Sequence, residues 1–176
     1  MRATLLLSML AVWALAAAAW PQLPARVPIH FDLAGRPDGW AARSALWWFL
    51  LPAFATTIGV VMGWLLPRWM LAMARANSRW LNMPRKAEFM ALPLAARERA
   101  VQAPVDWLRA LVVGVQALVG WIVYGSARVA AGDWQALPPA VSFVLLGAVL
   151  ACAIGLGIAG ARSVRREVER ASSGSP

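Results

Sequence analysis

One histidine and two aspartates in a single short stretch are the residues best suited to take part in chemistry. His30, Asp32 and Asp38 lie within the segment Trp20–Trp40, and His30 is the only histidine of the chain. A carboxylate beside a histidine can orient the imidazole and tune its protonation, which suits acid–base chemistry. The same residue types bind metal ions, so both kinds of site have to be weighed.

The chain offers few residues for either an acid–base site or a metal site. One histidine excludes a multi-histidine metal site, the lone Cys152 excludes an intrachain disulfide, and no second cluster accompanies the three residues. We therefore predict no catalytic residue, no metal site, no cofactor and no enzyme activity. Two other roles stay open. In a structural role, His30 and Asp38 hydrogen-bond the turns and Asp32 caps Gly35; in a recognition role, the loop contacts a peptide or protein partner.

The backbone of this stretch is expected to consist of short extended pieces joined by turns. Pro21, Pro24 and Pro28 fix φ and favour extended chain. The apolar residues Val27, Ile29 and Phe31 alternate with Pro28 and His30, which predicts a short strand. Gly35 and the sequence Pro37-Asp38-Gly39 are typical of turns. The side chains that we expect to bind a ligand or partner are His30, Phe31, Asp32, Gly35, Asp38 and Trp40.

The elements that hold this loop are predicted to be membrane helices. The chain has 176 residues, of which 61% are hydrophobic, and its mean hydropathy is +0.61. A soluble domain of this size has too little interior for so much apolar surface. A helix of about 20 apolar residues crosses a bilayer core while pairing its own backbone groups. Four segments fit this length: Ala3–Trp20, Ala45–Leu66, Trp107–Tyr124 and Ala140–Ala161.

We therefore predict an all-α integral membrane protein with four transmembrane helices. The first segment also fits a cleavable signal peptide, because Arg2 precedes it and the small residues Ala16–Ala19 end it. Either alternative leaves Pro21 on the far side of the membrane, so the remaining topology is the same.

The net charge of +9 is unevenly distributed along the chain. Arginine and lysine gather in the segment 67–106 and in the tail, at Arg68, Arg75, Arg79, Arg85, Lys86, Arg97, Arg99, Arg162, Arg165, Arg166 and Arg170. The loops 21–44 and 125–139 carry far fewer. The positive-inside rule then places both termini and the segment 67–106 in the cytoplasm and the two loops outside. Because the basic residues lie in segments between membrane spans, we expect the lipid bilayer to be the partner of this charge. We do not expect the protein to bind nucleic acid.

These boundaries divide the chain into four regions. Residues 1–66 hold two spans and the outer loop 21–44, residues 67–106 form a basic cytoplasmic segment, residues 107–161 form a helical hairpin, and residues 162–176 form a tail. In the basic segment, a face with Arg68, Arg75 and Arg79 predicts an extension of the second span, a helix on the membrane surface or a solvated loop helix. Breaks are expected at Pro84, Pro93 and Pro104, and disorder from Ser172 to Pro176.

Small residues recur along two of the spans. Glycine spaced four apart lets helix backbones approach closely, where packing drives association in lipid. The packing candidates are Gly59, Gly63, Gly147, Ala151, Gly155 and Ala159. Contacts within the chain explain both patterns, and a homo-oligomer is the alternative. Polar groups inside the spans, Gln116 and Thr56-Thr57, are expected to bond a neighbouring helix or their own backbone.

The outer loop resembles the DUF1648 domain, which occurs in bacterial membrane proteins including SdpI-like immunity and signalling proteins. The similarity rests on Leu23-Pro24, Val27-Pro28, His30-Phe31, Gly35, Asp38 and Trp40, followed by a span. Asp32 stands where family members commonly have asparagine. A second similarity is the segment from Asn82-Met83-Pro84 to Phe89.

The resemblance implies a bacterial plasma-membrane protein. SdpI-like proteins protect a cell from a secreted toxic peptide and can hold a repressor at the membrane, but they have more spans, so immunity does not carry over directly. We expect a non-catalytic protein that binds a peptide, an envelope component or a protein partner. The alternatives are a structural subunit of a membrane complex and, less favoured, a small enzyme or transporter that uses His30 and Asp38.

Overall fold

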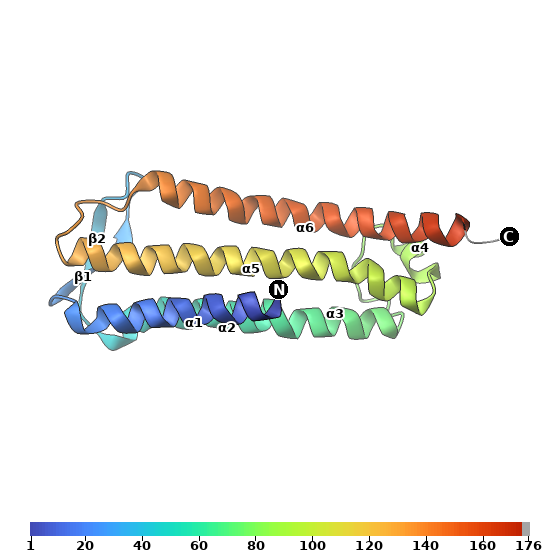
Figure 1. Ribbon diagram of the computed structural model, residues 1–176, viewed down its shortest axis with the longest axis horizontal. Helices are drawn as coiled ribbons and strands as arrows, with labels where there is room; N and C mark the ends of the chain where they lie inside the picture. The colour runs from blue at the N-terminus through green and yellow to red at the C-terminus, as the bar shows by residue number, and fades with distance from the viewer. Residues whose placement is uncertain (174–176) are drawn as a thin grey trace.

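Four long helical rods lie side by side in the computed structural model, which describes residues 1–173 (Figure 1). The first rod is α1 (Arg2–Ala19), followed by a 3₁₀ turn, η1 (Trp20–Gln22). The second runs from α2 (Ala45–Val60) through a π-helical turn, η2 (Val61–Leu65), into α3 (Leu66–Arg75). The third and fourth are α5 (Leu94–Ala130) and α6 (Pro139–Ser173). Each rod is long and apolar enough to cross a membrane, which confirms the predicted fold class.

The rods differ in length, so the molecule has one part that matches a membrane in thickness and a second part that extends beyond it. The 37 residues of α5 span about 55 Å at about 1.5 Å per residue, whereas a bilayer core is about 30 Å thick. The 18 residues of α1 match that thickness, and α1 begins about midway along α5 (Figure 1). The part beside α1 therefore fits the membrane. The first half of α5, the end of α6, α3 and the short helix α4 (Lys86–Ala91) project beyond it; we call this part the basic end.

The basic end is folded on its own apolar core. Phe89 of α4 is buried with Leu81, Met83, Val101 and Val164, which come from the connecting segment, α5 and α6. The predicted extension of the second span is α3. The break expected at Pro104 is wrong, because α5 continues through that residue. Disorder is also wrong for Ser172 and Ser173, which are helical; residues 174–176 lie outside the described part of the chain.

Two helix-interior prolines show why the helices continue. Pro104 has no N–H to donate to the carbonyl of Ala100, four residues earlier, and the Ser163 hydroxyl of α6 donates to that oxygen instead at 2.7 Å. Pro67 likewise leaves the Gly63 carbonyl without its usual donor, and Arg109 Nε reaches it at 3.4 Å. A neighbouring helix thus satisfies each freed carbonyl.

The polar groups inside the spans have partners as expected. Gln116 of α5 donates to the carbonyl of Ala55 in α2 at 2.7 Å, and Trp13 of α1 donates to the Thr56 hydroxyl at 2.8 Å. Thr57 donates to its own helix at Ala53. The bonds of Gln116 and Trp13 join α1, α2 and α5 within the apolar part of the bundle.

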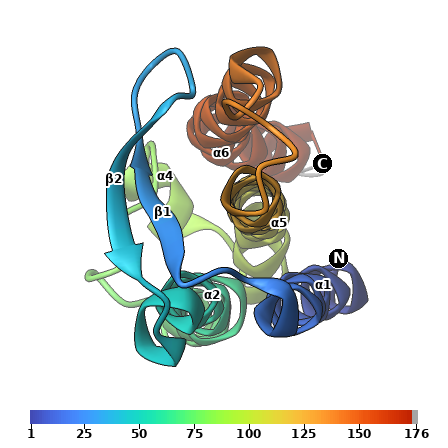
Figure 2. The ribbon, with the colours of Figure 1, turned by 90° about the vertical axis from the view of Figure 1, so that its left-hand side faces the viewer.

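At the other end of the bundle, which we call the hairpin end, the loop 21–44 forms an antiparallel pair of strands (Figure 2). They are β1 (Arg26–Phe31) and β2 (Pro37–Ala42). The strand expected around Val27–Phe31 is correct. The turn expected at Pro37-Asp38-Gly39 is wrong, because these residues belong to β2. The chain reverses earlier, at Asp32–Arg36, where Gly35 adopts φ +76° and the Asp32 carboxylate accepts the Arg36 N–H at 2.8 Å.

Candidate functional site

The hairpin is irregular where its chemical residues lie. Pro28 pairs with Trp40, His30 with Gly39 and Phe31 with Pro37. Ile29 and Asp38 are therefore extra residues, one on each strand, and each marks a β-bulge. Bulges of this kind re-aim side chains and are frequent beside functional sites.

The double bulge brings the histidine and an aspartate together. His30 Nδ1 lies 2.5 Å from Asp38 Oδ1. Gly39 stands opposite His30, and a Cβ at Gly39 would lie only 2.9 Å from the His30 Cβ. Glycine at this position thus permits the close pairing. The third residue, Asp32, does not join the pair, because its carboxylate closes the turn.

The pair lies on an open surface. The side chains of His30 and Asp38 are 71% and 49% exposed. Among the described residues 1–173, no group of three histidine, cysteine, aspartate or glutamate side chains is placed to hold a metal ion. The geometry therefore offers a solvated, hydrogen-bonded pair that a partner can reach from outside.

Both ends of the hairpin are fixed to the helices. At its base, the Arg43 guanidinium lies 4.5 Å from the Trp20 ring centroid and donates to the Leu23 carbonyl at 2.7 Å. At its tip, the Gly35 carbonyl accepts the N–H of Leu137, in the α5–α6 loop, at 2.7 Å. Figure 2 shows the hairpin running from α2 across to α6. It is therefore a clamped surface with few degrees of freedom.

A mainly apolar hollow of about 280 Å³ lies beneath the tip. Phe31, Asp32 and Gly35 line it from the hairpin, and Leu137 and Phe143 line it from the α5–α6 loop and α6. The predicted site residues are thus divided: His30 and Asp38 form the exposed pair, Phe31, Asp32 and Gly35 face the hollow, and Trp40 is exposed on β2. The residues from α6 were not predicted, since only their position in space joins them to the hairpin.

Residues 7–56 match the family DUF1648, described as a domain of unknown function. The chain contains a DUF1648 domain. The matched residues run from α1 through the whole hairpin into α2, so they include the loop that carries the resemblance. The second similarity, Asn82–Phe89, lies outside them. Searches of curated proteins and of solved structures gave no match.

Helix α1 packs closely on the second rod and on α5. A Cβ at Gly59 would lie 2.9 Å from Met9 Sδ, and one at Gly63 would lie 2.2 Å from Leu5 Cδ2. The Gly59–Gly63 pattern therefore faces α1 of the same chain. In α6, Gly155 faces Trp107, whereas a Cβ at Gly147 would have no neighbour within 4 Å.

This difference predicts unequal effects of two matched substitutions. Gly63→Val is expected to lower the unfolding free energy by about 1–3 kcal/mol, because overpacking displaces Leu5. Gly147→Val changes the same residue type in open space and is expected to have little effect. Thermal unfolding in detergent measures both. Equal stability of the two variants would contradict the α1 contact.

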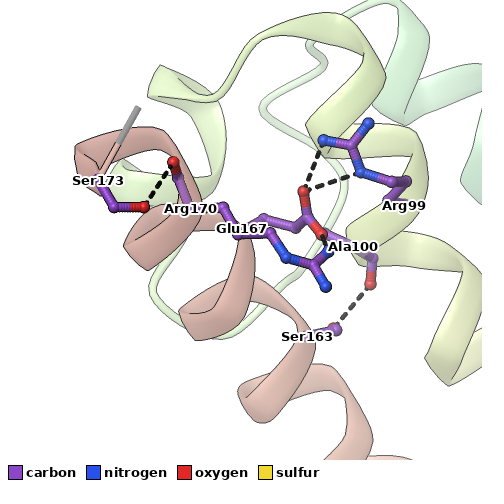
Figure 3. A network of polar contacts seen from close by, with 6 residues as sticks. All are labelled: Arg99, Ala100, Ser163, Glu167, Arg170 and Ser173. Carbon is purple, nitrogen blue, oxygen red and sulfur yellow. Dashed lines mark hydrogen bonds and ion pairs between the residues drawn. The ribbon is translucent and has the colours of Figure 1, made fainter. Parts of the chain in front are cut away.

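A buried carboxylate joins two helices of the basic end (Figure 3). Glu167 of α6 is 4% exposed. Its Oε2 accepts from Arg99 Nε and Nη2 of α5 at 2.9 and 2.8 Å, and its Oε1 accepts from Arg170 at 2.5 Å. Hydrogen bonding from Arg99 lowers the pKa of the Glu167 carboxyl, and burial opposes this shift. The three residues join α5 to α6 beyond the apolar part of both helices.

Proposed function

We propose that this chain is a multi-pass plasma-membrane protein that acts by binding, and that the β1–β2 hairpin is its recognition surface. The partner would be a peptide, an envelope component or another membrane protein. The observation that carries the proposal is the clamped hairpin with exposed, chemically specific side chains. Besides His30 and Asp38, it exposes Leu33 and Ile29, at 86% and 57%. Exposed apolar side chains beside a polar pair suit an interface.

The distribution of arginines supports an outward-facing hairpin. The basic end carries most of the positive charge, so the positive-inside rule favours its position in the cytoplasm, together with both termini. The hairpin lies at the opposite end of the bundle (Figure 1). In this orientation it meets molecules that arrive from outside the cell.

The outer edge of β2 supplies a way to hold an extended peptide. The sheet has two strands within the described residues, and β1 lies between β2 and α5 (Figure 2). The N–H and C=O groups on the far side of β2 therefore face no further strand. An added strand would pair with them by β-augmentation, while Trp40 and the His30–Asp38 pair would select its side chains.

Exposure also supports binding over catalysis. Catalytic acids and bases usually work in clefts that shift their proton affinity and exclude water. His30 and Asp38 lie on the surface, and the hollow beneath the tip is lined by Asp32 and not by this pair. An enzyme or transporter that uses His30 would need another group to supply the second reactive centre.

Alanine substitution of three residues tests the proposal. The combined variant His30→Ala, Asp38→Ala, Trp40→Ala is expected to insert normally yet fail to rescue a deletion strain, because it removes the pair and the aromatic contact. Trp80→Ala, which removes an exposed tryptophan at the basic end, is the matched control and should rescue. Full rescue by the triple variant, at normal membrane levels, would exclude the hairpin as the functional site.

A structural subunit is the second candidate, and the open face of α6 favours it. Gly147 and Ala151 lie exposed on α6, where another helix could approach closely. Native mass spectrometry in a mild detergent tests this role: a dimer or larger assembly supports it, and a monomer alone counts against it.

A further inference from the structure

A groove runs between α5 and α6 where the apolar part of the bundle meets the basic end. Its volume is about 500 Å³, within the range of sites that hold small molecules. Trp107, Ala151, Ile154 and Ile158 form its apolar part, and Arg162 and Arg166 lie at its other end. The groove is therefore amphipathic along its length.

The two arginines at the groove differ from their neighbours on α6. Arg165 pairs with Glu169 at 2.7 Å, and Arg170 pairs with Glu167. Within residues 1–173, the side chains of Arg162 and Arg166 form no ion pair and no hydrogen bond. The neighbouring carboxylates are already engaged, since Glu167 is bound by Arg99 and Arg170, Asp106 by Arg109 and Glu169 by Arg165. Arg166 acts on Glu169 through electrostatic attraction without an ion pair between them. The groove thus keeps two cationic side chains that have no anion in contact with them.

The level of the arginines fits a lipid headgroup. Arg162 lies 23 positions after Pro139, where α6 begins, which is about 35 Å of helix at about 1.5 Å per residue. A bilayer core of about 30 Å would therefore end just before Arg162. Trp107 is 41% exposed beside the groove, and tryptophan prefers this interfacial depth. The apolar part of the groove then faces acyl chains, and its basic part faces headgroups.

We propose that this groove is a binding site for one anionic phospholipid. An acyl chain would lie along Trp107, Ile154 and Ile158, and the phosphate would accept hydrogen bonds from Arg162 and Arg166. A second copy of the chain is disfavoured as occupant, because it would bring like-charged arginines together unless it supplied an acidic side chain. The inference concerns the opposite end of the molecule from the hairpin and does not depend on what the hairpin binds.

Native mass spectrometry of the full-length protein tests the site. The protein is purified in a mild detergent with phosphatidylglycerol or with phosphatidylcholine, and retained lipid is counted. We expect one phosphatidylglycerol to be retained and phosphatidylcholine to be lost. The double variant Arg162→Gln, Arg166→Gln should retain at least tenfold less phosphatidylglycerol. Arg165→Gln is the matched control, because it removes an arginine that is already paired with Glu169. This variant should retain the lipid.

A second variant tests the apolar part without changing charge. Ala151→Leu fills the groove at an exposed position and is expected to reduce retention while the protein stays folded, as judged by its thermal unfolding. Equal retention of the two lipids, unchanged retention in the double arginine variant, or a protein dimer in place of a lipid adduct would each overturn the proposal. Displacement of the lipid by glycerol 3-phosphate alone would also overturn it, since the acyl contact would then be unnecessary.

Discussion

Replacing Gly35 with alanine is expected to detach the hairpin tip from the α5–α6 loop and to lower stability markedly. An alanine Cβ at this position would lie 1.9 Å from the Leu137 carbonyl oxygen, and backbone on both sides leaves no flexible atom to yield. The residue also adopts φ +76°, which costs a residue with a Cβ about 1–2 kcal/mol. Losing the Leu137 N–H to Gly35 bond adds about 0.5–1.5 kcal/mol.

Gly132→Ala separates backbone strain from tip docking. Gly132 has nearly the same dihedral, φ +82°, but nothing lies within 4 Å of its Cβ position. Both variants should show the strain in thermal unfolding, and only Gly35→Ala should lose more. Hydrogen–deuterium exchange gives the local result: the Leu137 amide should exchange faster in Gly35→Ala alone. If that amide stays protected, the tip is not held by this contact.

The hairpin also shows what the sequence can predict. The apolar alternation of Val27, Ile29 and Phe31 indicated β1 correctly. The strand β2 was missed, because Gly35 and the sequence Pro37-Asp38-Gly39 both have turn chemistry and only one turn is needed. The structure chooses the earlier one, since there Asp32 closes the reversal and Gly35 meets Leu137. That choice depends on a contact about a hundred positions away in the chain, which local pattern cannot reveal.

The four spans were predictable for a different reason. Their signal is the length and polarity of whole segments, which lipid imposes directly. Their projection beyond the membrane was harder to predict, because Pro104 is typical of a break. Ser163, from another helix, satisfies the carbonyl that Pro104 frees. The pattern of the basic segment likewise indicated loops and short helices, although Phe89 and Val164 bring it into one core.

The same long-range pairing makes Glu167 the residue at the basic end with the largest expected effect. Arg99 lies 68 positions away in the sequence, so no local spacing marks the pair. Glu167→Gln keeps the side-chain shape but removes the charge that two arginines share. We expect the unfolding free energy to fall by about 1–2 kcal/mol, because hydrogen bonds to a buried charge exceed neutral ones and the partly exposed guanidinium groups are screened.

The matched control is Glu169→Gln, which removes the same charge two residues further along α6. Glu169 pairs with Arg165 on the surface, where both side chains are more than half exposed, and such pairs contribute little. Thermal and denaturant unfolding of the purified protein in detergent compare the two variants. Equal losses would mean that the burial of Glu167 is unimportant.

The dependence on pH gives a second measurement of the same interaction. The pKa of the folded Glu167 carboxyl lies below its ordinary value of 4.5, chiefly because Arg99 donates hydrogen bonds to the ionised form. A lowered pKa contributes stability that is complete above 4.5 and is lost as pH falls through the lowered value. The stability gap between wild type and Glu167→Gln at pH 7 should therefore close in acid. A gap that stays constant down to pH 3 would show that shape, and not the charge on Glu167, joins α5 to α6.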